Sequence, residues 1–377
     1  MPAMVGGFGN SKSSYLFFTN STASSNDTPP STTLTFPNNK NGTDVTNGTD
    51  VTKGLVFGVN NKLPFEIEHS KPKSQLESYL AGLIEGDGTF AVHDTNSTAK
   101  KYSPMIIVVF KKADLPLANL LRDLTNCGHV LIKPNRGYVL WQIQDLVSVF
   151  TIVKMINGFM RTPKIEGLQR TINWLNNYIV HNHNSKVPST ILILSKIKKI
   201  QFSPLDTSLI ENNSWFTGFS DADGNFSINI HKRSNKNLTR VQLYYRLEIR
   251  QNYNRVDSEG INPSFFSIMS KVAMFLGVSV YSRSRILKNK KFISFTVMSH
   301  NRESNSKISD YFNKYPLLSS KHLDFKAWDY VLELQKENSM TTSYLDKAIN
   351  IRKDFNSTRS TYNWNHLKDC YLIEIKK

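Results

Sequence analysis

Apolar and polar residues alternate along two segments in the second half of the chain, and this alternation predicts two β-strands. The apolar positions are Val241, Leu243, Tyr245, Leu247 and Ile249 within residues 240–250, and Phe226, Ile228 and Ile230 within residues 225–231. Successive side chains of a strand point to opposite faces of its sheet. One face of the predicted sheet is therefore apolar and covers a core, and the other carries side chains that can form hydrogen bonds.

The same order of elements is predicted twice along the chain. The first set is a helix ending near residue 87, strands near 89–93 and 105–110, a helix at 114–125, a hairpin at 129–143, and helices near 145–157 and 164–179. The second set is an apolar helix before residue 224, strands near 225–232 and 240–250, a helix near 263–276, a hairpin at 278–298, and helices beyond 300 and from 321. Hairpins connected by helices favour a mainly antiparallel sheet with helices on one face. We therefore predict an α+β fold of two pseudo-symmetric repeats.

Composition sets the domain boundaries. Residues 1–73 are rich in Ser, Thr, Asn and Gly, and such a segment cannot bury enough apolar surface to order itself. We assign residues 1–73 to a disordered tail, 74–180 to the first repeat, 181–208 to a linker, 209–355 to the second repeat and 356–377 to a C-terminal extension. No apolar run approaches the length of about 18 residues that a membrane span needs, so we expect no membrane partner.

The charge of the chain points to a polyanionic partner. Lys and Arg number 47 against 30 Asp and Glu, which gives a net charge of +17. Basic tails and solvated surfaces also produce such an excess, but here clusters such as residues 283–291 lie beside predicted strands, and this placement favours nucleic acid. The two cysteines, Cys127 and Cys370, lack the spacing of a zinc site, so we expect reduced thiols.

Two segments 136 residues apart carry the candidate chemistry, LAGLIEGDG at residues 80–88 and FTGFSDADG at residues 216–224. Each is an apolar helical stretch with small residues four positions apart, followed by an acid and a glycine. Small residues at this spacing share one face of a helix, so the two helices can pack side by side with Asp87 and Asp223 at the same end. Two such carboxylates repel each other, and a divalent cation such as Mg²⁺ would reverse the sign of that interaction.

Both segments resemble the motif that names the LAGLIDADG homing endonucleases, in the two-motif, single-chain form of that family. The first copy departs from the pattern at Glu85 and Gly86. The second departs at more positions, which are Phe216, Thr217, Phe219 and Ser220. Residues 112–118, 161–164 and 315–321 also resemble the family, and the resemblance extends over residues 74–355.

The resemblance implies a monomeric, site-specific endonuclease that hydrolyses both strands of double-stranded DNA with Mg²⁺ or Mn²⁺. By their match to the motif, Asp87 and Asp223 would each bind metal and serve one strand, together with the carbonyl groups of Gly86 and Ala222. Lys164 and Lys321 match the family's basic residue and would stabilise developing phosphorane charge or position water, unless they are ordinary surface lysines. Gln251 matches a water-organising position, whose counterpart in the first half falls near Lys111. Glu85 and Asp221 are expected to form local hydrogen bonds and not to bind metal.

The polar face of the predicted second sheet is the candidate base-reading surface, because Arg can pair with guanine, and Gln or Asn with adenine, in the major groove. Any half-solvated sheet would alternate similarly, but the two motifs favour DNA reading. The candidate readers are Asn225, Ser227, Asn229, His231, Arg240, Gln242, Tyr244, Arg246, Glu248, Arg250, Arg283 and Arg285. Two half-sheets would cover about 20 base pairs, or roughly two turns of DNA.

Two alternative functions use the same fold. Intron maturases of this family bind a group I intron RNA and assist its splicing, and a bifunctional protein would retain both aspartates. A DNA-binding protein that has lost cleavage activity is the other alternative, and the looser second motif supports it. The richness in Asn, Lys, Ile, Phe and Tyr, together with the family resemblance, predicts a protein encoded by a fungal mitochondrial intron.

Overall fold

The computed structural model describes residues 75–93, 103–232, 239–256, 259–287, 290–338 and 341–373. The predicted tail of residues 1–73 lies outside these ranges, as do residue 74 and the last four residues of the predicted C-terminal extension. Within the described part of the chain, no helix is both long enough and apolar enough to cross a membrane.

The first repeat forms an antiparallel four-stranded sheet in the order β1-β2-β4-β3. Its elements are α1 (Gln75–Asp87), β1 (Gly88–Ala91), β2 (Met105–Lys111), α2 (Leu115–Thr125), β3 (His129–Ile132), β4 (Tyr138–Ile143), α3 (Leu146–Ile156) and α4 (Ile165–Asn182). The predicted hairpin between β3 and β4 turns through Asn135 and Gly137, which both have positive φ angles, 58° and 65°. Asn and Gly are the residues that tolerate this conformation best.

The second repeat has the equivalent antiparallel sheet, in the order β5-β6-β8-β7. Its elements are α6 (Trp215–Asp223), β5 (Gly224–Lys232), β6 (Thr239–Arg250), α7 (Phe266–Leu276), β7 (Val280–Leu287), β8 (Lys290–Ser299), α8 (Arg302–Lys314) and α9 (Lys321–Asn338). The predicted α+β class and the repeated order of elements are confirmed.

Two segments contain more regular structure than their composition suggests. The predicted linker includes α5 (Pro188–Lys196), in which no residue is buried. The C-terminal region continues with α10 (Thr342–Lys353), and the segment after it buries Leu367, Cys370 and Leu372.

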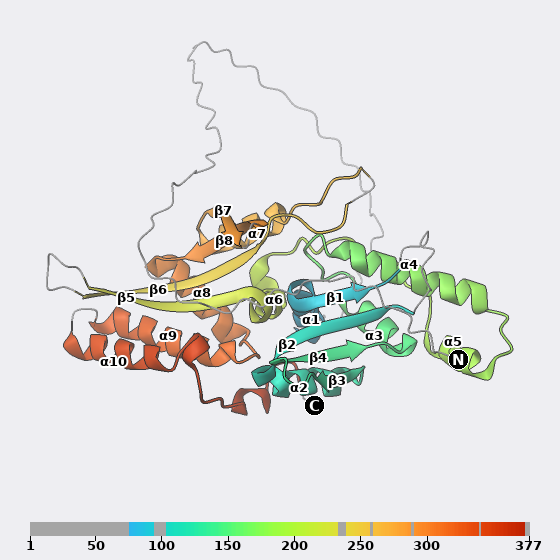
Figure 1. The fold of residues 1–377 in the computed structure, drawn as a ribbon, viewed down its shortest axis with the longest axis horizontal. Helices are drawn as coiled ribbons and strands as arrows, with labels where there is room; N and C mark the ends of the chain where they lie inside the picture. The colour runs from blue at the N-terminus through green and yellow to red at the C-terminus, as the bar shows by residue number, and fades with distance from the viewer. Residues whose placement is uncertain are drawn as a thin grey trace, which may run out of the picture. The chain divides into compact units, whose positions relative to one another are not determined.

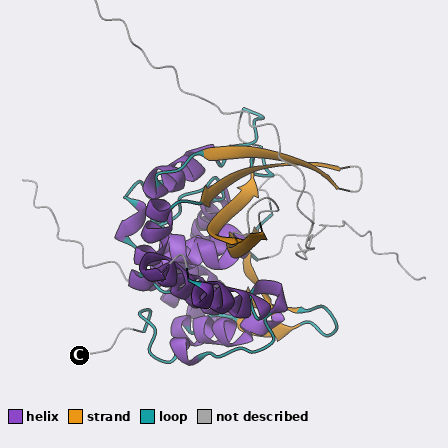
Figure 2. Ribbon diagram, turned by 90° about the vertical axis from the view of Figure 1, so that its left-hand side faces the viewer, coloured by secondary structure: helices purple, strands orange, loops and turns teal. Residues whose placement is uncertain are grey.

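Helices cover one face of each sheet and leave the other face open. Figure 2 shows the strands along one side of the repeats and the helices along the other. Burial alternates accordingly in β2, β4 and β6, where every second residue is buried. The predicted inward residues of β6, from Val241 to Ile249, are all buried. In Figure 1, α1 and α6 lie next to each other between the two sheets, so the ends of both helices are available to a common site.

Candidate active site and DNA-reading face

Glycine allows the two motif helices to pack with their backbones in contact. A Cβ atom on Gly82 would lie 2.0 Å from the carbonyl oxygen of Trp215, and a Cβ atom on Gly218 would lie 2.0 Å from the carbonyl oxygen of Tyr79. Real Cβ atoms do not approach backbone oxygens this closely. The equivalence of the two contacts shows that α1 and α6 cross about a pseudo-two-fold axis, as the small residues of the motifs predict.

This packing brings Asp87 and Asp223 to one place. A Cβ atom on Gly86 would lie 2.2 Å from the Cβ atom of Ala222 and 3.3 Å from Oδ2 of Asp223, so Asp223 reaches the end of the opposite motif helix. Burial, and then repulsion from Asp223, raises the pKa of Asp87 to about 7. Burial also raises the pKa of Asp223. The surroundings therefore disfavour the charged forms of both acids, and the attraction of Lys321 and Lys164 only partly offsets this effect.

The two acids of each motif have opposite surroundings. Glu85 accepts hydrogen bonds from the backbone N–H groups of Arg161 and Thr162, at 2.9 and 2.6 Å, and from Nε1 of Trp215 at 2.6 Å. Within the described residues, neither Asp87 nor Asp223 accepts a hydrogen bond from the protein. The first acid is saturated by protein donors, whereas the second is free to bind something else.

Asp221 repeats the arrangement of Glu85 in the second half. It accepts hydrogen bonds from the backbone N–H groups of Leu318 and Ser319 at 2.9 and 3.1 Å, and from the hydroxyl of Tyr79 at 2.9 Å. Trp215 and Tyr79 are equivalent residues of the two motif helices, so each helix donates to the first acid of the other. These contacts fix the loops that lead into α4 and α9.

These two loops position Lys164 and Lys321 at the C-terminal ends of the motif helices. The amino group of Lys164 donates to the carbonyl oxygens of Ile84, Gly86 and Gly88, at 3.1, 3.1 and 2.9 Å. The equivalent contacts of Lys321 go to Ser220 at 3.1 Å and Ala222 at 2.7 Å. A cation at this point satisfies carbonyl groups that a helix C-terminus leaves unpaired.

Both lysines are half-buried and are not ordinary surface residues. Burial lowers the pKa of Lys164 to about 8, although Asp223 and Asp87 oppose the change, and burial also lowers the pKa of Lys321. The ammonium group of Lys164 contacts the carbonyl of Gly86, that of Lys321 contacts the carbonyl of Ala222, and both act electrostatically on the acidic pair. The catalytic role of these lysines stays a prediction.

The donor set of the site fits a hard divalent cation. Two carboxylates and two backbone carbonyls are the oxygen ligands that Mg²⁺ accepts, and each carbonyl retains a lone pair beside its lysine contact. The described residues contain no group of three or more His, Cys, Asp and Glu side chains that could hold a metal by themselves. Water and a substrate phosphate would therefore have to complete the coordination.

Strand register places all of the predicted base-reading residues on the open face of the second sheet. Arg246 of β6 pairs with Asn225 of β5, and Arg250 pairs with Ser294 of β8, which in turn pairs with Arg283 of β7. The other predicted readers follow at every second position, and these are Ser227, Asn229, His231, Arg240, Gln242, Tyr244, Glu248 and Arg285. Whether they contact bases stays a prediction.

Glu248 organises the arginines at the edge of this face. It lies 3.4 Å from Nη1 of Arg283, it contacts Nη2 of Arg285, and it accepts a hydrogen bond of 2.8 Å from the hydroxyl of Ser294. As an acceptor already used by two arginines, Glu248 is better suited to holding them in place than to contacting cytosine.

The register separates Gln251 from its expected counterpart. Gly88 pairs with Val108 and Gly224 pairs with Leu247, so the equivalent of Lys111 is Arg250. The side chain of Gln251 donates to the hydroxyl of Ser282 on β7 at 2.7 Å. Arg250 acts electrostatically on Asp223 and Lys164, and Lys111 acts on Lys321. Sequence reasoning placed Arg250 only among the base readers, because its equivalence with Lys111 becomes visible only when the register of both strands is known.

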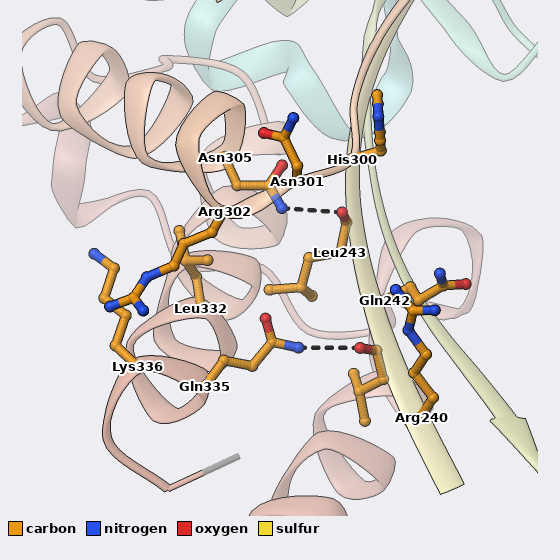
Figure 3. Close-up of a pocket in the computed structure, with 11 residues that line it drawn as sticks. Arg240, Gln242, Leu243, His300, Asn301, Arg302, Asn305, Leu332, Gln335 and Lys336 are labelled. Atoms are coloured by element: carbon orange, nitrogen blue, oxygen red, sulfur yellow. Dashed lines mark hydrogen bonds between the residues drawn. The ribbon is translucent and has the colours of Figure 1, made fainter.

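A pocket of about 420 Å³ lies at the other end of β6, between that strand, α8 and α9 (Figure 3). Here Asn305 donates to the carbonyl of Leu243 and Gln335 donates to the carbonyl of Val241, both at 3.1 Å. Strand β8 pairs with β6 only from Tyr245 onward, so these amides satisfy carbonyls that would lack a strand partner. These two amides stabilise the part of β6 that extends beyond its pairing with β8. Neither motif aspartate lines the pocket.

Comparisons with known proteins agree with this geometry. A model described as LAGLIDADG endonuclease matches residues 80–175 and 216–332. Over 388 aligned residues the chain is 41% identical to the intron-encoded DNA endonuclease aI3 of Saccharomyces cerevisiae, covering 99% of this chain and 82% of the relative. It is 26% identical to a cox1 intron-2 protein of Schizosaccharomyces pombe, covering 77% of each. An intron-encoded RNA maturase, bI4 of S. cerevisiae, is 26% identical over 150 residues, 40% of this chain and 19% of that one.

Solved structures share the fold. The LAGLIDADG homing endonuclease I-GzeII, crystallised in complex with its DNA target, superposes with a TM-score of 0.52 at 18% identity, and the match covers 75% of this chain and 99% of that one. The meganuclease I-SmaMI bound to DNA gives a TM-score of 0.53 at 16% identity, with the same coverage.

Proposed function

Because this chain belongs to the LAGLIDADG endonuclease family, we propose that it is a site-specific endonuclease that makes a double-strand break in a DNA target of about two helical turns. The observation that carries this proposal is the pair of aspartates at the ends of α1 and α6. Asp87 and Asp223 come together without protein donors, whereas Glu85 and Asp221 beside them are saturated.

We propose that Asp87 and Asp223, with the carbonyls of Gly86 and Ala222, hold divalent metal. Bound metal would supply an activated water and neutralise charge on the phosphates. Lys164 and Lys321 would keep the carbonyls in position and place a positive charge near each scissile phosphate. Since Arg250 and Lys111 act electrostatically on this site from the two open sheet faces, we assign them the task of orienting the phosphate backbone there.

The test is cleavage of a duplex that carries the joined exon sequences flanking the gene, with Mg²⁺, with Mn²⁺ or with EDTA. We expect one metal-dependent double-strand break. Asp87→Asn and Asp223→Asn should each reduce the cleavage rate at least 100-fold and leave specific binding within about threefold, because the carboxylates contact metal and not bases. Asp123→Asn, which changes an exposed acid of α2, is the matched control. Full cleavage by either motif variant would contradict the assignment.

A maturase is the second candidate, because the chain also resembles an intron-encoded RNA maturase over part of its length. Salt-sensitive binding of the exon duplex without cleavage in either metal would favour this function or an inactive DNA-binding protein. Splicing of the host group I intron RNA in the presence of the protein would then separate the two. The relatives are named as intron-encoded proteins, one of them from a cox1 intron, which supports the mitochondrial intron origin predicted from composition and the family resemblance together.

A further inference from the structure

The two open sheet faces differ in chemistry although their backbones are equivalent. Counting from Gly88 and Gly224, Ile107 and Val109 of β2 occupy the positions that Arg246 and Glu248 occupy in β6. The equivalence holds across the sheets. Val109, Leu140 and Leu131 form one continuous row over β2, β4 and β3, and the same row of the second sheet contains Glu248, Thr296 and Tyr281.

The apolar row belongs to the open face and not to the core. Val109, Leu131 and Leu140 are half-buried, as is Ile107 in the neighbouring row. Among the described residues, none of these four is part of the core or of the partly buried apolar set that packs against it. Their neighbours on the strands, such as Val108 and Trp141, are fully buried on the helix side. These four side chains therefore point to the open face and would contact any molecule that binds there.

A major groove placed over the rows of Ile107 and Val109 would meet few side chains that can form hydrogen bonds. The polar residues Thr89, Gln142 and His129 share the row of Ile107, and the amide of Gln142 is already bonded to Sδ of Met105 at 3.0 Å and to Gln144 at 2.8 Å. Apolar side chains would desolvate the donors and acceptors of most base edges without replacing their hydrogen bonds. Thymine is the exception, because its C5-methyl group offers an apolar surface in the major groove.

We propose that the two half-sites are read by different chemistry, the second through hydrogen bonds and the first through thymine methyl groups packed on Ile107, Val109, Leu131 and Leu140. This inference rests on the proposed function, because it assumes that both open faces contact DNA. Lys111, the last residue of β2, continues the open face from this row toward Lys321 of the active site, and this continuity supports DNA as the occupant.

Deoxyuridine provides a direct test, since it differs from thymidine only by the missing methyl group. All thymines of one half-site at a time are replaced by deoxyuridine in the joined-exon duplex, and the dissociation constant is measured at fixed salt. We expect weaker binding when the first half-site is substituted, by about fourfold for each fully buried methyl group. Substitution in the second half-site should change binding less than twofold.

Variants assign the effect to the sheet. Leu140→Ala should reduce the thymine-over-uracil preference in the first half-site only, by about the share of one buried methyl contact, because Ile107, Val109 and Leu131 keep theirs. Leu131→Ala, measured beside it, should give a similar partial loss. Leu192→Ala is the matched control, because it makes the same truncation at a leucine of α5 that is 58% exposed, and it should leave the preference unchanged. Equal uracil effects in both half-sites, a first half-site without thymine, or an unchanged preference in Leu140→Ala would each overturn the inference. Cleavage of the unmodified duplex, measured on the same preparations, shows separately whether the proposed function holds.

Discussion

At the scale of single residues, the two acids of each motif have different roles because different numbers of hydrogen-bond donors surround them. Glu85 and Asp221 are buried, and burial raises the pKa of both, but each is held by several N–H or O–H groups. A buried carboxylate with this many donors fixes the loops around it. Asp87 and Asp223, two residues further along each helix, lack such donors and repel each other, which suits them to a cation.

The hydrogen bonds of Glu85 can be tested with Glu85→Gln. The three N–H donors from Arg161, Thr162 and Trp215 converge on two carboxylate oxygens, so a carboxamide would place its own NH₂ group against one of them. We expect a loss of about 1–3 kcal/mol in the free energy of unfolding, measured by urea denaturation. Glu303→Gln is the control, because that side chain is 79% exposed in a surface pair with Lys307 and should cost less than about 0.5 kcal/mol. Equal stability of the two variants would show that Glu85 does not anchor the loop.

At the scale of elements, the contact between α1 and α6 determines where the aspartates lie. These helices approach so closely that Gly82 and Gly218 each face a backbone carbonyl of the other helix. Backbone atoms cannot move aside as a flexible side chain can, so any larger residue forces the helices apart. Separation at this contact would shift both aspartates together.

Gly82→Ala should therefore impair stability and activity at once. The added Cβ atom would lie 2.0 Å from the carbonyl oxygen of Trp215, and relief of this overlap should cost about 1–3 kcal/mol or more. Thermal unfolding and single-turnover cleavage measure the two effects. Gly137→Ala, where a Cβ atom meets nothing within 4 Å, is the comparison and should retain full cleavage after the modest penalty of its positive φ angle. Normal cleavage by Gly82→Ala would mean that the helices can separate without disturbing the site.

Most elements could be predicted from the sequence because their signals are local. Alternation in β6 and the turn residues Asn135 and Gly137 need no knowledge of the rest of the fold. The pairing of the motif glycines was also predictable, because the motif occurs twice. The carbonyl contacts of Lys164 and the equivalence of Lys111 with Arg250 were not, because they depend on strand register and on loops that distant acids hold in place. Helix α5 was missed because none of its residues is buried, so no burial pattern marks it.

At the scale of the whole molecule, the arginines of the second open sheet face lie on strands that occupy different positions in the sheet. The chain has a net charge of +17, and arginines lie both on the interior strand β6 and on the edge strand β7. Arg246 is half-buried, and burial lowers its pKa. Arg283 and Arg285 have side chains 46% and 41% exposed and are tethered by Glu248. We therefore expect Arg246 on the interior strand to meet base edges, and the exposed Arg283 and Arg285 on the edge strand to meet phosphates.

This difference predicts two distinct effects on DNA binding. For a protein that neutralises Z phosphates, log K falls with log salt with a slope of about −0.9Z, so Arg283→Gln should reduce the slope by about one and leave the sequence preference unchanged. Arg246→Gln should instead relax the preference at one or two base pairs, costing about 1–3 kcal/mol against the preferred base. Binding to the target and to single-base variants of it, measured over a series of salt concentrations, distinguishes the two. A changed base preference in Arg283→Gln, or a change of slope alone in Arg246→Gln, would reverse the assignment of the strands, since only contacts to base edges carry sequence information.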